Sequence, residues 1–461
     1  MFNTRYIAEK PDYIETRGNK NLLIWKNIPH WMITDNELPI LLNMLNGRDK
    51  LSVVIEKFSN KIDREKNEVT KDLLKILPSL MRSKVTHKTP KKKSNSKYNN
   101  KPILENITIN VTNKCNLNCK HCFNRLLELP PDTLVVSDVR NFIECGEKYI
   151  SKNLTLALLG GEPLLNKNKV LSIAKIGYDF GFESIVSTNG IKIDDDFAKN
   201  AVDLNLIVQV SLEGNIPKIN NNIRGNGTFE KALKGINILI NNGVYTIICM
   251  VCYKDNFHYL EDFIDFGYSL GVDEIRFIPL KLMGNTLDNK LKPISNKKMI
   301  LKVLEIIKKN PEYTDIIGRD YFTILGTICK LSNKRQYCGT GLKTILIDSD
   351  GETYPCPNHN FPEFKCGNIK IKEFKEIWLK SQTLINLRKQ YNIDIINEEC
   401  SECIVKYWCM GGCRGEAYYN TKSLNSKAMQ CKNIKNAIIE MFWILSENQD
   451  IMKNATKLEQ F

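Results

Sequence analysis

Three cysteines stand close together in one loop of this 461-residue chain, spaced as Cys115-x3-Cys119-x2-Cys122. Thiolates grouped in this way are ligands for zinc or for an iron–sulfur cluster. A structural zinc site is closed by four ligands, and no fourth candidate stands nearby in the sequence. The spacing therefore favours a 4Fe-4S cluster. Three thiolates on four irons leave one iron without a protein ligand, and a reactive molecule can chelate that iron.

A second group of seven cysteines lies toward the C-terminus. Its members are Cys338, Cys356, Cys400, Cys403, Cys409, Cys413 and Cys431. One zinc site of four cysteines would leave three of them unused, so two further iron–sulfur clusters are the more economical interpretation. Four other cysteines lie in apolar helix or strand patterns and are predicted to be core thiols, namely Cys145, Cys249, Cys252 and Cys329.

The chain shows no charged segment followed by an apolar one at its start, as a secretion signal would. It also has no apolar run near the roughly 20 residues that a membrane span requires. We therefore expect a protein of the cytoplasm, a compartment in which disulfides are rare. We expect no membrane partner. The formal charge of +14 fits an acidic partner, such as nucleic acid or an acidic peptide, or simply a lysine-rich composition.

Strands and helices that alternate along the chain must position the first three cysteines. Between residues 102 and 310, six short apolar runs alternate with helical patterns, which predicts parallel strands in an α/β fold. The runs are Ile107–Val111, Leu154–Leu159, Ser184–Ser187, Leu206–Leu212, Val244–Cys252 and Glu274–Leu280. Six such units predict a partial (β/α)6, TIM-like barrel whose site lies at the C-terminal ends of the strands.

Polar and glycine-rich motifs follow several of these strands. The cysteine loop follows the first strand, and Gly160, Gly161, Glu162 and Pro163 follow the second. Thr188-Asn189-Gly190 ends the third strand, and Ser211 ends the fourth. Each motif alone is weak, but their recurrence at successive strand ends indicates one shared site.

This arrangement resembles the radical S-adenosylmethionine (radical SAM) superfamily across the 103–280 region. The resemblance implies that the open iron binds S-adenosylmethionine and that a 5′-deoxyadenosyl radical takes a hydrogen atom from substrate. It also implies that Gly160 to Pro163 accept hydrogen bonds from the methionine ammonium, and that Ser211 and Arg224 hold the ribose and the methionine carboxylate. Asn189 would belong to the family's TNG turn, and His121 would pack on the adenine.

The seven later cysteines resemble the SPASM extension of radical SAM enzymes that modify peptides and proteins. By that resemblance, one auxiliary 4Fe-4S cluster is held by Cys400, Cys403, Cys409 and Cys431, and another by Cys338, Cys356 and Cys413, giving three clusters in all. The second set lacks a fourth cysteine, since Thr340 and Thr344 stand in the stretch where some relatives supply it. Cys366 or His359 could close that site, or it stays open for a substrate thiolate.

Composition divides the chain into six segments. They are a winged-helix-like module at 1–82, a basic flexible linker at 83–101, the radical SAM barrel at 102–310, a connecting segment at 311–337, a cysteine-rich C-terminal iron–sulfur domain at 338–446 and a tail at 447–461. The linker is rich in lysine with little apolar surface; the alternative is a nucleic-acid-binding tail.

The N-terminal module resembles the small element that binds leader peptides of ribosomally made precursors, typified by the chaperone of pyrroloquinoline quinone biosynthesis. A free strand edge would accept the leader as an added strand. A winged helix can also bind DNA, but the third helix has no unusual cluster of basic residues. The sequence therefore favours a precursor peptide as partner over nucleic acid.

We therefore expect a peptide maturase that forms a thioether or other cross-link and draws electrons from an external low-potential donor. The alternatives are an anaerobic sulfatase maturase and a non-catalytic iron–sulfur scaffold. Sulfatase maturases have an aspartate base directly after the cysteine equivalent to Cys356, where this chain has Pro357. The sequence leaves open the precursor, the bond formed, the electron donor and the oligomeric state.

Overall fold

The six predicted strands form one parallel sheet. The structure, a computed structural model, describes residues 2–89, 102–123, 130–317 and 338–447. The strands lie in the order β12-β11-β10-β9-β8-β7, which confirms the α/β prediction. Their bounds are β7 (Leu104–Thr112), β8 (Ile150–Gly160), β9 (Glu183–Thr188), β10 (Ile207–Ser211), β11 (Thr246–Cys252) and β12 (Glu274–Pro279).

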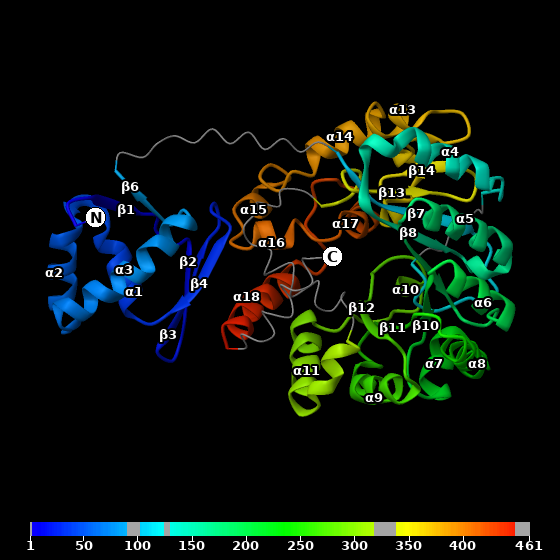
Figure 1. The fold of residues 1–461 in the computed structure, drawn as a ribbon, viewed down its shortest axis with the longest axis horizontal. Coiled ribbons are helices and arrows are strands. Elements are labelled where there is room, and N and C mark those ends of the chain that lie inside the picture. The colour runs from blue at the N-terminus through cyan, green and yellow to red at the C-terminus, as the bar shows by residue number, and fades with distance from the viewer. Residues whose placement is uncertain (1, 90–101, 124–129, 318–337, 448–461) are drawn as a thin grey trace.

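Helices follow the strands and cover the sheet (Figure 1). They are α4 (Val136–Gly146), α5 (Lys167–Asp179), α6 (Asp195–Asp203), α7 (Pro217–Arg224), α8 (Thr228–Asn241), α9 (Leu260–Leu270), α10 (Asn285–Asp288) and α11 (Asn296–Lys309). Apolar residues of strands and helices form one large core, in which Cys252 is buried as predicted. Cys249 is buried too, but Cys145 is exposed on α4, so its prediction as a core thiol was wrong. Cys329 lies outside the described residues.

The cysteine-rich region continues the same sheet, which the sequence analysis did not anticipate. Strand β13 (Thr344–Ile347) pairs in parallel with β7, so that Ile345 lies opposite Ile107. Strands β14 (Glu352–Tyr354) and β15 (Gly367–Asn368) then extend it in antiparallel fashion. The helices that follow are α13 (Phe374–Trp378), α14 (Gln382–Gln390), α15 (Glu398–Ser401), α16 (Lys406–Cys409), α17 (Arg414–Thr421) and α18 (Cys431–Glu447).

The N-terminal module combines helices with two small sheets. Its two sheets have the orders β2-β3-β4 and β5-β1-β6. The strands are β1 (Arg5–Ala8), β2 (Tyr13–Arg17), β3 (Lys20–Trp25), β4 (His30–Thr34), β5 (Asn46–Lys50) and β6 (Thr86–Lys88), and the helices are α1 (Glu37–Met44), α2 (Leu51–Ile62) and α3 (Lys66–Arg82).

The start of the predicted flexible linker at 83–101 is instead folded. Strand β6 pairs with β1, and Val85 is fully buried among the module's helices. Backbone pairing and an apolar side chain outweigh the polar composition there. Residues 90–101 lie outside the described residues.

The module packs against the last helix of the chain. On β3, Leu22 and Ile24 join the main core, whereas their neighbours face the module's own helices. Trp31 of β4 stacks on Phe442 of α18, with ring centroids 4.6 Å apart. Figure 1 shows the β2–β4 sheet beside α18. Both faces of this sheet are therefore covered, and removing residues 1–82 would uncover apolar surface on α18. No described helix is both long and apolar enough to cross a membrane.

Candidate functional site

The cysteine loop opens into a cavity at the C-terminal ends of the parallel strands. The cavity has a volume of about 410 Å3. Its lining includes most of the predicted site residues, namely Cys115, Cys119, Cys122, His121, Gly160, Gly161, Glu162, Asn189, Ser211 and Arg224. Pro357, next to Cys356, also lines it. The cavity therefore extends from the first cysteine group to the edge of the second.

Gly160 and Gly161 let the second strand end lie against the backbone that leads into Cys115. A Cβ on Gly160 would lie 2.1 Å from Thr112 O, and one on Gly161 would lie 2.3 Å from Lys114 O. Gly160 also has a φ of +139°, which side chains disfavour. Two backbone hydrogen bonds close this contact, from Gly161 N to Thr112 O and from Glu162 N to Lys114 O, both 2.8 Å. The glycines therefore set the position of the cysteine loop.

The carboxylate of Glu162 fastens this loop to the next strand end. It accepts hydrogen bonds from Thr188 Oγ1 (2.6 Å), Asn189 N (2.7 Å) and Leu164 N (3.0 Å). Burial raises the pKa of Glu162, and the three hydrogen bonds counteract that rise. Pro163 begins a short 3-10 turn and is buried. Contact of this motif with a methionine ammonium stays a prediction.

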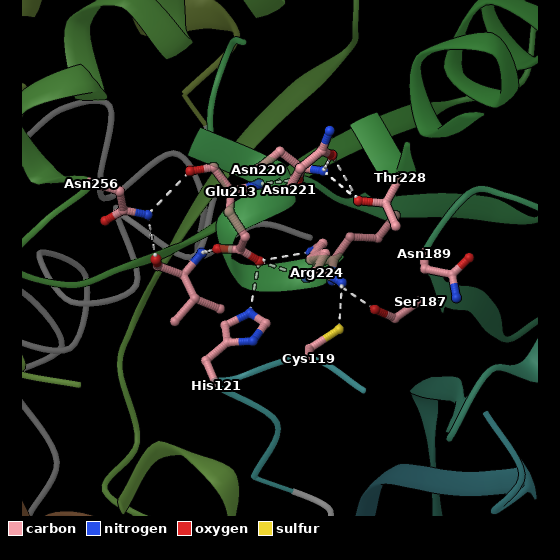
Figure 2. Close-up of polar contacts among 12 residues, drawn as sticks. Cys119, His121, Ser187, Asn189, Glu213, Asn220, Asn221, Arg224, Thr228 and Asn256 are labelled. Atoms are coloured by element: carbon pink, nitrogen blue, oxygen red, sulfur yellow. Dashed lines mark hydrogen bonds and ion pairs between the residues drawn. The ribbon is translucent and has the colours of Figure 1, made fainter. Parts of the chain in front are cut away.

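A fully buried carboxylate, Glu213, organises the centre of the site (Figure 2). It accepts hydrogen bonds from His121 Nε2 (2.8 Å), Arg224 Nη2 (2.6 Å), Arg224 Nε (3.1 Å) and Val251 N (3.0 Å). Burial alone would raise its pKa, but the charges of His121 and Arg224 outweigh burial and lower it to about 2. The sequence analysis gave Glu213 no role. A carboxylate directly after a buried strand was the available signal.

Arg224 reaches from Glu213 toward the cysteine loop. Its Nη1 lies 3.9 Å from Cys119 Sγ. Burial raises the pKa of Cys119 to about 11, although the arginine opposes that rise. Asn189 Nδ2 donates to Asn116 Oδ1 at 2.8 Å, which joins the third strand end to the loop. Ser211 lies opposite Cys249 in the β10–β11 pairing, and both line the cavity.

The start of α10 supports the cysteine loop from the other side, which the sequence analysis missed. Donors on α10 and on Asn289, the residue after it, bind four successive backbone carbonyls of the loop. The bonds are Asn285 Nδ2 to Cys119 O (2.9 Å), Asn289 Nδ2 to Lys120 O (3.2 Å), Thr286 Oγ1 to His121 O (3.3 Å) and Asn285 N to Cys122 O (2.9 Å). These bonds hold the loop in place through its backbone carbonyls.

The later cysteines interact electrostatically within two sets, and that each set holds a cluster stays a prediction. Burial raises the pKa of Cys409 to about 12, and the nearby Cys403, Cys431 and Cys400 raise it further. Burial likewise raises the pKa of Cys356 to about 12, with Cys338 and Cys413 adding to the rise. A buried thiolate needs a positive counter-charge, which a coordinated metal supplies. Within the described ranges, no group of three or more His, Cys, Asp or Glu could hold a metal ion as the side chains stand.

Thr340, Cys366 and His359 occupy different places around the Cys338, Cys356 and Cys413 set. Thr340 Oγ1 lies 3.2 Å from Cys338 Sγ and donates to Cys356 Sγ at 3.4 Å. His359 is fully buried, with Nδ1 3.6 Å from Cys356 Sγ and Nε2 2.6 Å from the Tyr391 hydroxyl. Cys366 instead packs in the main core and donates to Phe364 O.

Comparisons with known proteins agree with this geometry. The sequence pattern of the radical SAM superfamily matches residues 109–267, and that of the SPASM iron–sulfur cluster-binding domain matches residues 338–404. The mycofactocin maturase MftC of Mycolicibacterium smegmatis is 26% identical over 70% of this chain and 82% of its own length.

Two further relatives differ in how much of the chain they cover. The cysteine-type anaerobic sulfatase-maturating enzyme of Clostridium novyi is 24% identical over 70% of this chain and 91% of its own length. The crystal structure of Streptococcus suis SuiB bound to precursor peptide SuiA covers 93% of this chain and 100% of that one, with a TM-score of 0.56 and 15% identity. The structural likeness therefore extends into the N-terminal module.

Proposed function

Because the chain is a radical SAM enzyme with a SPASM domain, we propose that it modifies a ribosomally made precursor peptide, by a thioether or other cross-link. One observation carries the proposal: a single cavity runs from the Cys115–Cys122 loop to Pro357, beside the buried Cys356. A peptide segment in this cavity would lie between the first cysteine group and an auxiliary one. MftC is named a maturase, and SuiB has been crystallised with a bound precursor peptide. Both support the same substrate class.

The residues around the cavity fit S-adenosylmethionine as cofactor. When bound to the open iron, it supplies a radical that takes a hydrogen atom from substrate. Arg224 would hold the methionine carboxylate while Glu213 fixes its guanidinium in place. Ser211 would hold the ribose, and His121, oriented by Glu213, would pack on the adenine. The enclosing strand ends would exclude water from the reacting groups.

The cysteine positions support three 4Fe-4S clusters. The first set comprises Cys115, Cys119 and Cys122. Each of the two later sets would hold one further cluster. Cys400, Cys403, Cys409 and Cys431 would supply all four ligands of one of these clusters. An external low-potential donor would supply electrons.

The cluster of Cys338, Cys356 and Cys413 would keep one open iron. Cys366 packs in the main core and donates a hydrogen bond to Phe364 O. Burial lowers the pKa of His359 to about 3, so its imidazole is neutral. With Cys356 as a thiolate ligand, Nδ1–H would donate to Cys356 Sγ and the Tyr391 hydroxyl would donate to Nε2. Since each iron of a cubane takes its own terminal ligand, His359 is better placed to orient Cys356 than to bind a fourth iron. A substrate cysteine thiolate would take the open position.

The N-terminal module would bind the leader segment of the precursor. Its strands and helices suit a winged-helix-like unit, placed beside the partial barrel that the six parallel strands would form. The outer strands β2 and β4 each have an edge without a neighbouring strand among the described residues, and such an edge can take an added strand.

Hydrogen–deuterium exchange of the full chain with and without precursor tests the module's role. Slower exchange at residues 13–17 or 30–34 is expected when precursor is added. Unchanged exchange throughout 2–89, at precursor concentrations that saturate turnover, would show that the module has another role.

Mass spectrometry of a co-expressed precursor tests the function itself. A short open reading frame beside the gene for this chain would nominate the precursor to use. A mature peptide two mass units lighter, with one free thiol fewer, is expected for a thioether, because forming the bond removes two hydrogen atoms. A peptide unchanged in mass, in the presence of active S-adenosylmethionine cleavage, would refute the assignment.

A protein-modifying enzyme of the sulfatase-maturase kind is the second candidate, because the Clostridium novyi enzyme is similar over most of its length. Pro357 stands where those enzymes carry an aspartate base. Incubation with a sulfatase-derived cysteine peptide separates the two: aldehyde formation would favour this candidate.

A further inference from the structure

A buried arginine lies next to the auxiliary cysteines with most of its hydrogen-bonding capacity unused. Arg414 begins α17, directly after Cys413, and is 2% exposed. Its Nη1 donates to Ser426 O at 2.7 Å. Its Nε and Nη2 have no hydrogen-bond partner within the described part of the chain. A guanidinium is always charged and carries five N–H donors, so leaving two groups unpaired in a buried place is costly unless an anion is nearby.

The surroundings of Arg414 belong to both auxiliary cysteine sets. A Cβ on Gly411 would lie 3.6 Å from its Cζ and Nε, so the guanidinium lies against the turn between Cys409 and Cys413. The charge of Arg414 also acts on Cys400 of the four-cysteine set. On the other side it acts on His359, the neighbour of Cys356. The cation therefore lies between the two places where the clusters would be held.

We propose that Arg414 is a positioning residue for the auxiliary clusters, whose Nε and Nη2 donate hydrogen bonds to cluster or cysteine sulfur and whose charge raises their reduction potentials. Reduction adds one electron, and hence one negative charge, to a cluster. Hydrogen bonds to the sulfurs and a nearby positive charge stabilise the reduced state more than the oxidised one. This inference rests on the proposed function, because it requires the two auxiliary clusters.

Redox titration of the reconstituted full-length enzyme, followed by electron paramagnetic resonance, tests the role without measuring turnover. The variants are Arg414→Gln, which removes the charge, and Arg414→Lys, which keeps the charge but not the planar donors. Arg140→Gln, at a partly exposed position on α4, is the control for substitution of an arginine. The cluster of the Cys115–Cys122 loop, in the same molecule, is the internal reference.

Arg414→Gln is expected to lower the midpoint of at least one auxiliary cluster by about 59 mV or more, which is a tenfold change in the one-electron equilibrium constant. The midpoint in Arg414→Lys should lie between those in Arg414→Gln and in the wild type, and the midpoint of the loop cluster should not change. Selective loss of auxiliary iron from Arg414→Gln, with partial recovery in Arg414→Lys, would also support the proposal.

Unchanged auxiliary midpoints in Arg414→Gln with full iron content would overturn the role of Arg414, and so would an equal shift of all three clusters. Iron and sulfide analysis of the wild-type enzyme separates this result from failure of the proposed function. Content sufficient for the loop cluster alone would refute the auxiliary clusters themselves.

Discussion

Replacing Glu213 with glutamine should both destabilise the protein and free Arg224 from the carboxylate that holds it. The substitution keeps the size of the side chain but removes its charge. In the native protein, His121 Nε2 and the Nε and Nη2 of Arg224 all donate to Glu213 Oε1. Val251 N donates to the other oxygen, Oε2. A glutamine presents one oxygen and one NH2 group, so its NH2 group would face one of these donors. The Arg224 cation would remain buried without its anion.

The expected magnitude follows from the burial of the pair. Breaking a buried ion pair by removing one partner typically costs about 3–5 kcal/mol. The shift in the pKa of Glu213, from 4.5 to about 2, corresponds to on the order of 3 kcal/mol favouring the charged form in the folded state. Because the folded-state pKa is lowered, this contribution is present above about pH 4.5 and is lost as the pH falls toward 2.

Chemical denaturation of the reconstituted enzyme measures the effect, and equilibrium binding of S-adenosylmethionine measures the function. Glu213→Gln should lower the free energy of unfolding by about 3 kcal/mol and weaken binding at least tenfold, because Arg224 is no longer held in place. Glu274→Gln is the matched control, since Glu274 pairs with Arg276 (Nε to Oε1, 2.5 Å) and is also buried. It lies at the start of β12, away from the loop.

The reasoning fails in two distinguishable ways. A loss of stability below about 1 kcal/mol would show that the ion pair is not buried as described. Equal weakening of S-adenosylmethionine binding by Glu213→Gln and Glu274→Gln would show that lost stability, rather than the freed Arg224, is responsible.

Three further changes probe the loop, its support and the core thiol. Changing Cys115, Cys119 and Cys122 together to alanine should leave two clusters and a brown protein that cleaves no S-adenosylmethionine; stoichiometric zinc with little iron in anaerobically purified wild type would contradict the cluster assignment. Gly161→Ala places a methyl group 2.3 Å from Lys114 O, so stability should fall by about 1–3 kcal/mol and loop-cluster iron should be lost, whereas wild-type iron content would count against the close contact. Cys366→Ala should leave the auxiliary spectra unchanged, and a labile or altered cluster would identify Cys366 as a ligand after all.

The amino-acid sequence by itself determined the strands and the chemistry of the loop. Runs such as Val244–Cys252 carry apolar residues on both faces, as a covered parallel strand does, and all six runs were found in the sheet. Cysteine spacing was equally informative, because ligands to one cluster must be close and a short loop ensures that closeness. These signals are local, so no knowledge of distant contacts was needed.

Only the tertiary structure decided which distant groups share a contact. Glu213 meets His121 across 92 positions, and Asn113 meets Asp348 across 235. The β2–β4 sheet packs on α18, where Arg17 bonds Glu440 across 423 positions. Hydrophobic periodicity shows that a face is buried but not which surface covers it. The packing of the N-terminal module on α18 was therefore not predicted, and the predicted flexible linker at 83–101 was wrong at its folded start. A buried charge such as Arg414 has no sequence signature at all, because only the folded surroundings decide that its Nε and Nη2 meet no acceptor among the described residues.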